Sequence, residues 1–310
     1  MPVAADTTPA PSTGSIPLVP EVAALFRDRH RFSKDIVERS TTTFGPSWTA
    51  DFEDTLQHLY PDPTARELAV KGYASFALDS MRRQARFERE RTYPAKTYAE
   101  AAEEVYFDEN HMHAQYLPGL LLSHFLWPHH YRQLQFFEMA FVASMARRPH
   151  AQFAEIGIGT GLYSRRVLQR VPAARGMGFD ISPSSKAFAE NHLRAYGFGH
   201  RYDVELCDVV TTPIGRYDSL ICVEVLEHLE DPLTFLQAMR ESLAPGGKAF
   251  ITAAVNAANA DHIYLYRTAD EVLDHLHAAG FALEQAFVGA AYKPARPGLP
   301  VPIAAAFVVG

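Results

Sequence analysis

This chain is poor in cysteine and has no long apolar run. Its 310 residues include only two cysteines, Cys207 and Cys222, and both fall in segments expected to form strands or strand ends. Two such residues provide no disulfide framework, which predicts a reducing compartment. No apolar run approaches the roughly 20 residues that cross a bilayer, and the N-terminus lacks the charged-then-apolar order of a signal peptide. We therefore expect a cytoplasmic protein with no membrane partner.

An excess of positive charge is also missing, since the formal net charge is −7 at pH 7. Proteins that bind nucleic acid or anionic membranes normally present a basic face, so no nucleic-acid partner is expected. One basic run, residues 82–91, is interrupted by glutamates and follows a helical pattern, and we interpret it as a solvated helix face. The composition predicts an ordinary globular protein whose partner is a small molecule.

The composition changes along the chain. Residues 1–19 are rich in proline, alanine, serine and threonine, which predicts a disordered tail. Residues 20–148 follow helical patterns: Pro63 suits the first position of a helix, and apolar residues recur at helical spacing as far as Met81. The aromatic content of this helical region predicts a cap that encloses a pocket for a small substrate.

Residues 149–310 have a different pattern, in which short apolar runs alternate with helical segments. The first expected strand is Phe153–Ile156, and the last two are Phe281–Val288 and Ile303–Val309. Strands that alternate with helices form parallel sheets covered on both faces. The sequence therefore predicts an α/β fold for this half of the chain.

Three glycines directly follow the first expected strand. The segment Phe-Ala-Glu-Ile-Gly-Ile-Gly-Thr-Gly, residues 153–161, contains Gly157, Gly159 and Gly161 just before a helical pattern. Glycines are needed at such a turn because the backbone must bend tightly and approach a ligand without a Cβ in the way. A glycine loop also occurs as a purely structural turn, so its neighbours decide its meaning.

Carboxylates follow the next strands of the same expected sheet. Asp180 ends the second strand, where it can accept hydrogen bonds from both ribose hydroxyls of a nucleotide. Asp208 and Val209 follow the third strand, where a side chain can meet an adenine amino group, and Glu224 follows the fourth. Ligands of open α/β sheets bind at the carboxyl ends of the strands, so these residues predict a nucleotide-containing cofactor.

These motifs together resemble the class I S-adenosylmethionine-dependent methyltransferases, over about residues 153–309. The resemblance implies a Rossmann-like sheet that is mostly parallel with its last strand antiparallel, in a domain over residues 149–310 that binds S-adenosylmethionine. It implies that Asp180 contacts the ribose, that Asp208, beside Val209, contacts the adenine, and that Glu224 begins a loop flanking the cofactor. The residues implied for the methionine part are Glu155, Gly157, Gly159 and Gly161.

A dinucleotide-dependent dehydrogenase is the competing interpretation of the glycine loop. Its fingerprint places the last glycine three residues after the second, whereas Gly159 and Gly161 are two apart. The segment Glu-Val-Leu-Glu-His-Leu, residues 224–229, also belongs to the methyltransferase pattern. We therefore expect a methyltransferase.

Histidines indicate where the methyl acceptor binds. His275 and His277 lie in an expected helix, where residues two apart point away from each other, so they cannot share an ion. His111 and His113 follow an expected helix stop and are predicted to be extended, which lets both imidazoles reach one metal. His262 follows the fifth strand, in a loop that faces the methyl group in this fold. His111, His113 and His262 are therefore a candidate site for a divalent metal such as zinc or iron.

This histidine set, with the segment Asp-His-Ile-Tyr-Leu-Tyr at residues 261–266, resembles the 2-oxo-acid C-methyltransferases that make β-methylated amino-acid precursors of peptide natural products. The resemblance implies a metal held by histidines that binds the carboxylate and ketone oxygens of the substrate. A Lewis-acidic metal makes the adjacent C–H at C3 more acidic, so that this carbon can attack the methyl group. His262 then lies near the reaction centre, and Tyr264, Arg267 and Gln115 are candidates to bind the substrate carboxylate or orient the enolate.

Two other functions stay open. A metal-independent O-, N- or C-methyltransferase of another small metabolite would use His262 or Glu224 as a base, with the helical region as a lid. A non-catalytic protein that keeps the cofactor fold gives no reason for a histidine at the methyl face.

The helical region also offers candidates for core packing and assembly. We interpret His124, His129 and His130 as core or interface residues, and His228 as a helix-end packing residue. A homodimer is the expected assembly, because two-fold dimers are the commonest oligomers. The candidate lid or interface residues are Phe125, Trp127, Phe136, Phe137 and Phe141.

Overall fold

A seven-stranded sheet is the centre of the structure, a computed structural model that describes residues 17–147 and 151–310. The strand order is β3-β2-β1-β4-β5-β7-β6. Strand β7 runs antiparallel to its neighbours β5 and β6, whereas the other pairs are parallel, which confirms the predicted Rossmann-like sheet. The strands are β1 (Gln152–Ile156), β2 (Arg175–Asp180), β3 (Tyr202–Leu206), β4 (Tyr217–Cys222), β5 (Leu243–Val255), β6 (Leu283–Ala290) and β7 (Ile303–Val309).

Helices connect these strands, and polar side chains set where several of them begin. The side chains of Ser182, Asp231 and Thr268 each accept a hydrogen bond from a backbone N–H in the first turn of the helix that follows. Serine, aspartate and threonine are preferred at this position because their side-chain oxygens accept hydrogen bonds from N–H groups that have no partner within the helix. The helices of this half are α10 (Leu162–Arg170), α11 (Pro183–Ala195), the 3-10 turn η4 (Leu226–His228), α12 (Pro232–Glu241) and α13 (Ala269–Ala278).

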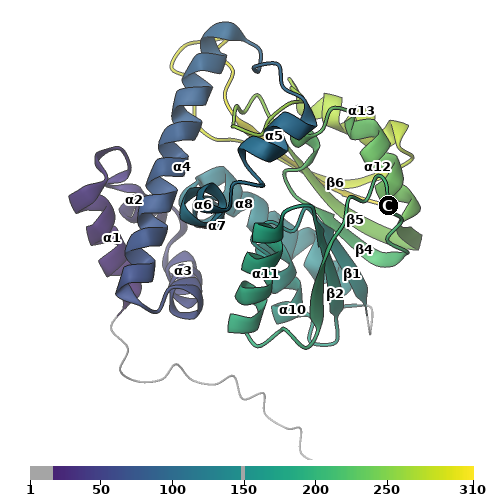
Figure 1. Cartoon of the computed structure of the whole chain (residues 1–310), viewed down its shortest axis with the longest axis horizontal. Helices are drawn as coiled ribbons and strands as arrows, with labels where there is room; N and C mark the ends of the chain where they lie inside the picture. The colour runs from purple at the N-terminus through teal and green to yellow at the C-terminus, as the bar shows by residue number, and fades with distance from the viewer. Residues whose placement is uncertain (1–16, 148–150) are drawn as a thin grey trace, which may run out of the picture.

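The N-terminal half is helical and is arranged around the long helix α4 (Pro63–Glu90), with α1, α2 and α3 gathered around its N-terminal part (Figure 1). Asp62 begins α4, because its side chain accepts a hydrogen bond from the N–H of Ala65. Among the described residues, no helix combines the length and the apolar composition needed to cross a bilayer. The other elements are α1 (Leu18–Arg29), η1 (Arg31–Ser33), α2 (Ile36–Phe44), α3 (Pro46–Leu59), α5 (Tyr98–Glu104), α6 (Glu109–His111), the π-helical η2 (Met112–Tyr116), α7 (Leu117–Leu126), α8 (Pro128–Phe136), the π-helical η3 (Phe137–Val142) and α9 (Ala143–Met145).

The first helix begins earlier than the sequence predicts. Leu18 and Val19, which we assigned to the disordered tail, are the first residues of α1. Their N–H groups both donate to the carboxylate of Glu53 in α3, so a distant side chain caps this helix start. The rest of the predicted tail, residues 1–16, lies outside the described residues.

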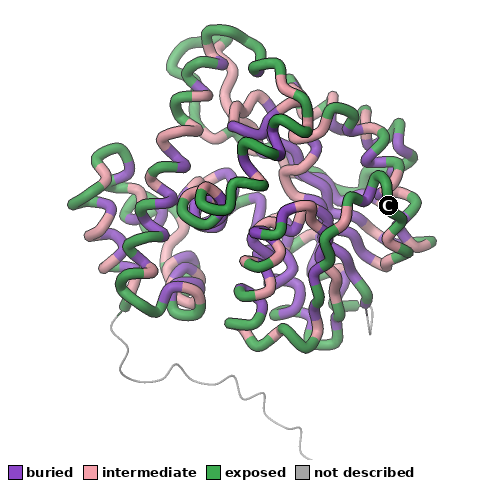
Figure 2. Tube along the Cα trace, in the orientation of Figure 1, coloured by how far each residue is buried: buried purple, intermediate pink, exposed green. Residues whose placement is uncertain are grey.

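The helical region and the sheet share one hydrophobic core, as the buried residues in Figure 2 indicate. The ring of Phe250 in β5 lies 4.8 Å from that of Phe137 and 5.9 Å from that of Phe141, centroid to centroid. Phe125, Phe137 and Phe141 are 0% exposed. They are therefore core residues, and the interpretation of these three rings as an intersubunit surface is wrong.

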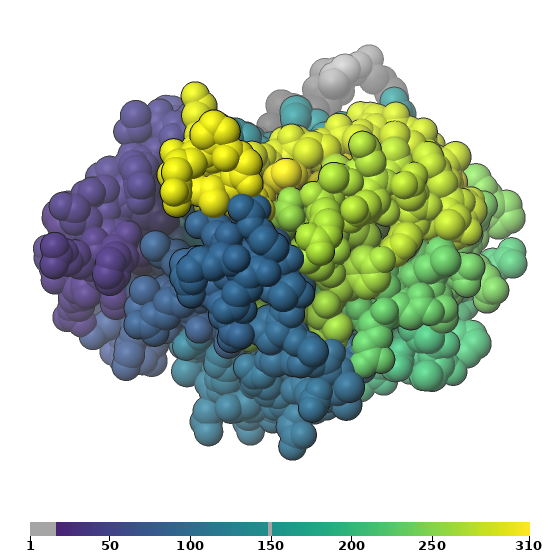
Figure 3. Space-filling view, turned by 90° about the horizontal axis from the view of Figure 1, so that it is seen from above, coloured from purple at the N-terminus to yellow at the C-terminus, as the bar shows by residue number. Residues whose placement is uncertain are grey.

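The C-terminal hairpin closes against helix α4. Residues 291–302, between β6 and β7, lie beside the end of α4 in the view from above (Figure 3). The hydroxyl of Tyr292 donates to Glu88 Oε1 at 3.2 Å, and the guanidinium of Arg91 donates to the carbonyl oxygen of Gly298. This contact joins the last part of the chain to the helical region above the carboxyl ends of the strands.

Glycines allow helix α4 to approach α7 closely. A Cβ added to Gly119 would lie 2.4 Å from the Cβ of Phe76, and one added to Gly72 would lie 2.6 Å from the carbonyl oxygen of Ala114. We therefore expect Gly119→Ala to lower the free energy of unfolding by about 1–3 kcal/mol, despite the better helix propensity of alanine. The control is Gly199→Ala, where no atom lies within 4 Å of the added Cβ. Equal denaturant midpoints for the two variants would contradict this packing.

Candidate active site

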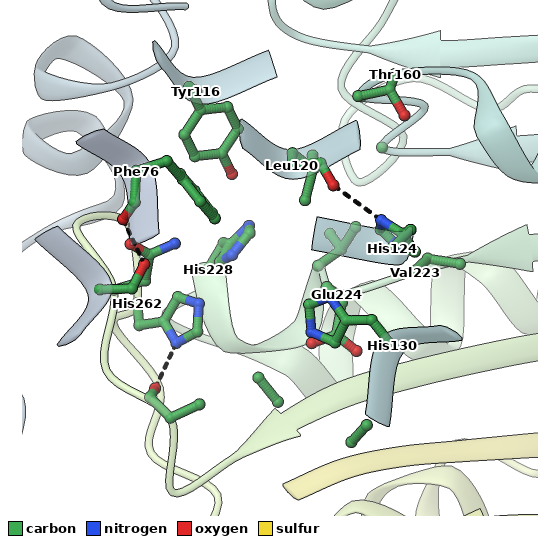
Figure 4. Close-up of a pocket in the computed structure, with 18 of the residues that line it drawn as sticks. Phe76, Tyr116, Leu120, His124, His130, Thr160, Val223, Glu224, His228 and His262 are labelled. Atoms are coloured by element: carbon green, nitrogen blue, oxygen red, sulfur yellow. Dashed lines mark hydrogen bonds between the residues drawn. The ribbon is translucent and has the colours of Figure 1, made fainter. Parts of the chain in front are cut away.

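A cavity of about 910 Å³ lies between the helical region and the carboxyl ends of the strands. Its walls come from the loops after β1, β2, β3, β4 and β5 and from helices α4, α7 and α8. This is the edge at which open α/β sheets bind ligands, and the volume is that of a site for drug-sized molecules. Figure 4 shows part of this wall, where histidines and Glu224 gather.

The glycine loop adopts the conformation for which the sequence selects glycine. Gly157, Gly159 and Gly161 have φ angles of +70°, +49° and +72°. A Cβ on Gly157 would lie 2.5 Å from Cγ2 of Val225. Gly157 and Gly159 line the cavity, whereas Gly161 starts α10 and faces Ala189 of helix α11. Gly161 therefore allows close helix packing and does not line the cavity, and its contact with the methionine part stays a prediction.

Glu155 supports this loop from below. Its carboxylate accepts hydrogen bonds from the N–H and the hydroxyl of Ser164, in the first turn of α10. Burial raises the pKa of Glu155 to about 8 against the effect of these two donors. Glu155 also lines the cavity, so it can both fix the start of α10 and face a ligand.

Asp180 joins the glycine loop to the loop after β2. One carboxylate oxygen accepts from the N–H of Gly159 at 3.0 Å, and the other accepts from the N–H of Ser182 at 2.8 Å. Burial raises the pKa of Asp180 to about 6, although the backbone donors oppose this shift. Asp180 lies on the cavity wall, where the sequence predicts a ribose contact.

Asp208 and Val209 line the next part of the wall, after β3. Asp208 is exposed and accepts a hydrogen bond from the N–H of Val210 at 3.0 Å. Tyr98, at the start of α5, faces this region: burial and then the charges of Asp208 and Asp180 raise its pKa to about 12. Tyr98 is a wall residue that the sequence analysis missed, because nothing local places α5 beside the third strand.

Glu224 has a strained backbone at the cavity. Its φ angle is +52°, which is uncommon for a residue other than glycine. Thr252 of β5 stabilises this turn: its hydroxyl accepts from the N–H of Glu224 at 2.9 Å and donates to the carboxylate of Glu224 at 2.6 Å. Burial raises the pKa of Glu224 to about 7. Glu224, which the sequence predicts to begin the loop flanking the cofactor, is therefore a carboxyl group that can gain or lose a proton near neutral pH.

His262 lies beside Glu227 and His228, with ligand atoms of all three side chains within 4.8 Å of one another. These residues come from the loops after β4 and β5. The carbonyl oxygen of Glu227 accepts hydrogen bonds from the N–H groups of Ile263 at 2.8 Å and Tyr264 at 2.9 Å. This backbone pairing brings the two loops together.

Hydrogen bonds leave the Nε2 atoms of both histidines available as ligands. His262 Nδ1 lies 2.6 Å from the carbonyl oxygen of Ala257, which can only accept, so Nδ1 carries the proton. The hydroxyl of Tyr106 donates to Asp261 at 2.9 Å and so accepts from Nδ1 of His228, also at 2.9 Å. Histidines that bind metals are oriented in this way, through their second ring nitrogen.

Glu227 is a buried carboxyl group that could serve as a metal ligand. It is 0% exposed, and its carboxyl group lies beside the carboxyl of Glu224 and the backbone N–H groups of Glu227 and Ala254, without a well-formed hydrogen bond to either of its oxygens among the described residues. Burial and then the charge of Glu224 raise the pKa of Glu227 well above its usual range. A buried carboxylate is normally paired or coordinates a metal, so a divalent cation fits the donor set of Glu227, His228 and His262.

Asp261 supports this cluster from behind. Its carboxylate accepts from the hydroxyls of Tyr106 at 2.9 Å and Tyr116 at 2.6 Å. Burial opposes ionisation of Asp261, but His228, His262 and the two hydroxyls outweigh it and lower its pKa to about 2. Asp261 therefore keeps its charge beside the histidines and fixes their surroundings.

The backbone predicted for His111 and His113 is wrong. His111 ends helix α6 and His113 lies in the π-helical η2, so the two residues are not extended and point to different sides. Asp108 accounts for the difference: its side chain caps α6 by accepting from the N–H of His111, where we expected a helix stop. His113 is exposed, and neither histidine lines the cavity. Among the described residues, His262 is grouped with Glu227 and His228 instead.

The three residues proposed to bind a substrate carboxylate lie outside the cavity wall. Gln115, Tyr264 and Arg267 are not among the residues that line it. Tyr264 packs on Tyr266, with ring centroids 4.8 Å apart, and the N–H of Arg267 donates to the carboxylate of Glu271. The structure thus gives Tyr264 and Arg267 local packing roles.

Comparison with known proteins shows what the cofactor side of this site is similar to. Residues 154–249 match the family described as "Methyltransferase domain". The ubiquinone biosynthesis O-methyltransferase of Xanthomonas campestris pv. campestris (strain B100) is 29% identical over 113 residues, which are 36% of this chain and 46% of that protein. The chain thus spans less than half the length of the first curated relatives that it matches.

Two solved structures resemble a larger part of the chain. The mitomycin 7-O-methyltransferase MmcR has a TM-score of 0.51 and 16% identity, over 81% of this chain and 74% of that one. The pyocyanin biosynthetic protein PhzM has a TM-score of 0.52 and 15% identity, over 82% and 76%. At this identity the likeness establishes the shared fold.

Proposed function

We propose that this chain, which contains an S-adenosylmethionine-dependent methyltransferase domain, methylates a small molecule bound in its cavity. The observation that carries the proposal is the cavity itself. The glycine loop, Asp180 and Asp208 form one side of it, as this cofactor requires, and helices α4, α7 and α8 enclose the other. A site closed by aromatic helices suits a small acceptor. S-adenosylmethionine, when bound, supplies an electrophilic methyl group.

We further propose that the acceptor is a 2-oxo acid, methylated at C3 with the help of a divalent metal such as zinc or iron. Glu227, His228 and His262 would hold the ion, in place of the set with His111 and His113. Two histidines and a carboxylate are a donor set that first-row metals accept. When bound, such an ion acts as a Lewis acid that makes the C–H beside the ketone more acidic.

The residues of this chain would position the reactants and exclude water. His228 and His262 are fixed through their Nδ1 atoms, and Asp261 with Tyr106 and Tyr116 holds them in place. Glu224 lies in the same wall with a pKa of about 7, which suits a general base near neutral pH. Glu224 is the side chain that would accept the C3 proton.

Glu224 also supports a second candidate function, metal-independent O- or N-methylation. A phenol or an amine needs only positioning and a base, and Glu224 could accept its proton directly. This alternative assigns no role to the candidate metal site formed by Glu227, His228 and His262.

Transfer of a labelled methyl group separates the two functions. Untagged protein would be incubated with methyl-labelled S-adenosylmethionine and with matched panels of 2-oxo acids, phenols and amines. We expect label at C3 of a 2-oxo acid and loss of that product after treatment with a chelator. Label on oxygen or nitrogen that is indifferent to the chelator would favour the metal-independent function.

A further inference from the structure

Helices α7 and α8 bring a second group of histidines to the cavity, separate from the candidate metal site. His124, His129 and His130 all line the cavity, and the ring centroids of His124 and His130 lie 5.1 Å apart. Figure 4 shows these two rings on the opposite side of the close-up from His228 and His262. The methyl transfer proposed above uses none of the three.

The hydrogen bonds of His124 and His130 fix where their protons lie. His124 Nδ1 lies 2.9 Å from the carbonyl oxygen of Leu120, which can only accept, so this nitrogen is the donor. The hydroxyl of Ser123 donates to the same carbonyl oxygen, and it therefore accepts from Nδ1 of His130 at 3.1 Å. Both rings thus keep an acceptor lone pair on Nε2.

One of these two acceptors lacks a protein partner in the part of the chain that the structure describes. Nε2 of His124 is buried and has no hydrogen-bond partner among the described residues. Burial lowers the pKa of His124 to about 4 and that of His130 well below its usual range, so both rings are neutral at pH 7. A buried acceptor without a partner is costly, and a ligand that donates a hydrogen bond would satisfy it.

The surroundings of these histidines are flat and aromatic. Trp127 stacks on Phe76, with ring centroids 5.7 Å apart, and lies nearly parallel to the ring of His129 at an interplanar angle of 10°. Tyr73 also lines this part of the cavity and is 0% exposed. Such walls favour a planar ring over an aliphatic chain or a charged group.

We propose that His124 and His130 bind an O–H or N–H group on an aromatic ring of the methyl acceptor, such as the phenol or indole side chain of an aromatic 2-oxo acid. The inference rests on the proposed function only in placing the acceptor in this cavity. The two acceptor nitrogens then select phenols, indoles or similar rings over analogues that lack the donor hydrogen. A site built to accept a hydrogen bond discriminates strongly, because the wrong ligand leaves its nitrogen unpaired.

Matched probes test this selectivity without any turnover. Phenol and anisole, and likewise indole and 1-methylindole, differ in one donor hydrogen. We expect the protein to bind the donor of each pair about fivefold more tightly, and His130→Phe to remove this preference. His200→Phe, at an exposed histidine that is bonded to the carbonyl oxygen of Gly197, should keep it. Equal affinities within each pair for the wild type, or a preference that survives in both His124→Phe and His130→Phe, would overturn the proposal.

Nitrogen-15 NMR of histidine-labelled wild-type protein gives a second readout that needs no variant to fold. Phenol should move the Nε2 resonances of two neutral histidines, and anisole should leave them in place. Unchanged Nε2 resonances at saturating phenol would also overturn the proposal. Because neither S-adenosylmethionine nor a metal is added, this failure is distinct from a failure of methyl transfer.

Discussion

The Asp180→Ala variant should bind S-adenosylhomocysteine about a hundredfold more weakly than the wild type does. Asp180 accepts from the N–H groups of Gly159 and Ser182, so it holds two cavity loops as well as facing the expected ribose. Each hydrogen bond to a charged group contributes about 1.5–3 kcal/mol, and a hundredfold change in affinity corresponds to about 2.7 kcal/mol. Isothermal titration calorimetry measures this affinity directly.

Two comparisons make the result specific to the carboxylate. Asp203→Ala, at an exposed position of β3, should leave the affinity unchanged. The pKa of Asp180 is raised to about 6, so the wild type should bind more weakly as the pH falls through that value, because protonation removes the acceptor charge. Asp180→Asn should lose this pH dependence. If the Asp180→Ala variant bound S-adenosylhomocysteine with wild-type affinity, the prediction that Asp180 contacts the cofactor would be wrong.

Removal of His262 should abolish metal binding by the untagged protein. With one of the three donors missing, the affinity for a divalent ion should fall by at least about a hundredfold, and the metal found by elemental analysis should drop from about one ion per chain to almost none. The C-methylated product should disappear in parallel.

Controls for this prediction use histidines outside the cluster. His277→Ala and His113→Ala change exposed residues that are not part of it, so both variants should keep the metal. The His113 variant also separates the site formed by Glu227, His228 and His262 from the one that the sequence predicts. Both proposed metal sites would be rejected if the wild-type protein contained no zinc, iron or similar ion and if its activity were unaffected by chelators.

The sheet and its glycine loop are predictable from the sequence because their signals are local. Alternation of apolar runs with helices specifies the strands, and the positive φ angles of Gly157 and Gly159 require the residue type that the sequence shows. Asp180 could be assigned to the cavity because the carboxyl ends of parallel strands all lie at the same edge of the sheet, which is where ligands bind. Boundaries differ by a few residues, as at β6, which begins at Leu283, whereas the expected strand begins at Phe281.

The metal cluster could not be predicted in full, because it depends on contacts between loops. The pairing of the Glu227 carbonyl oxygen with two backbone N–H groups beyond His262 is invisible in the sequence. From the sequence we interpret His228 as a packing residue, although Glu227 and His228 are neighbours in the segment Glu-His-Leu, residues 227–229, and so had to lie near the same strand end. The error at His111 was a local one: Asp108 can end one helix or cap the next, and here it caps.

The ring of Phe250 determines whether the chain can be divided. It lies in the central sheet but packs against Phe137 and Phe141 of the helical region, so the core on this face of the sheet is built from both halves. A fragment that starts at β1 would expose this aromatic face to water and aggregate, whereas two independent modules would tolerate the cut. The helices that form the acceptor side of the cavity therefore cannot be replaced as a separate domain. A new substrate preference must arise by substitutions within one cooperative folding unit.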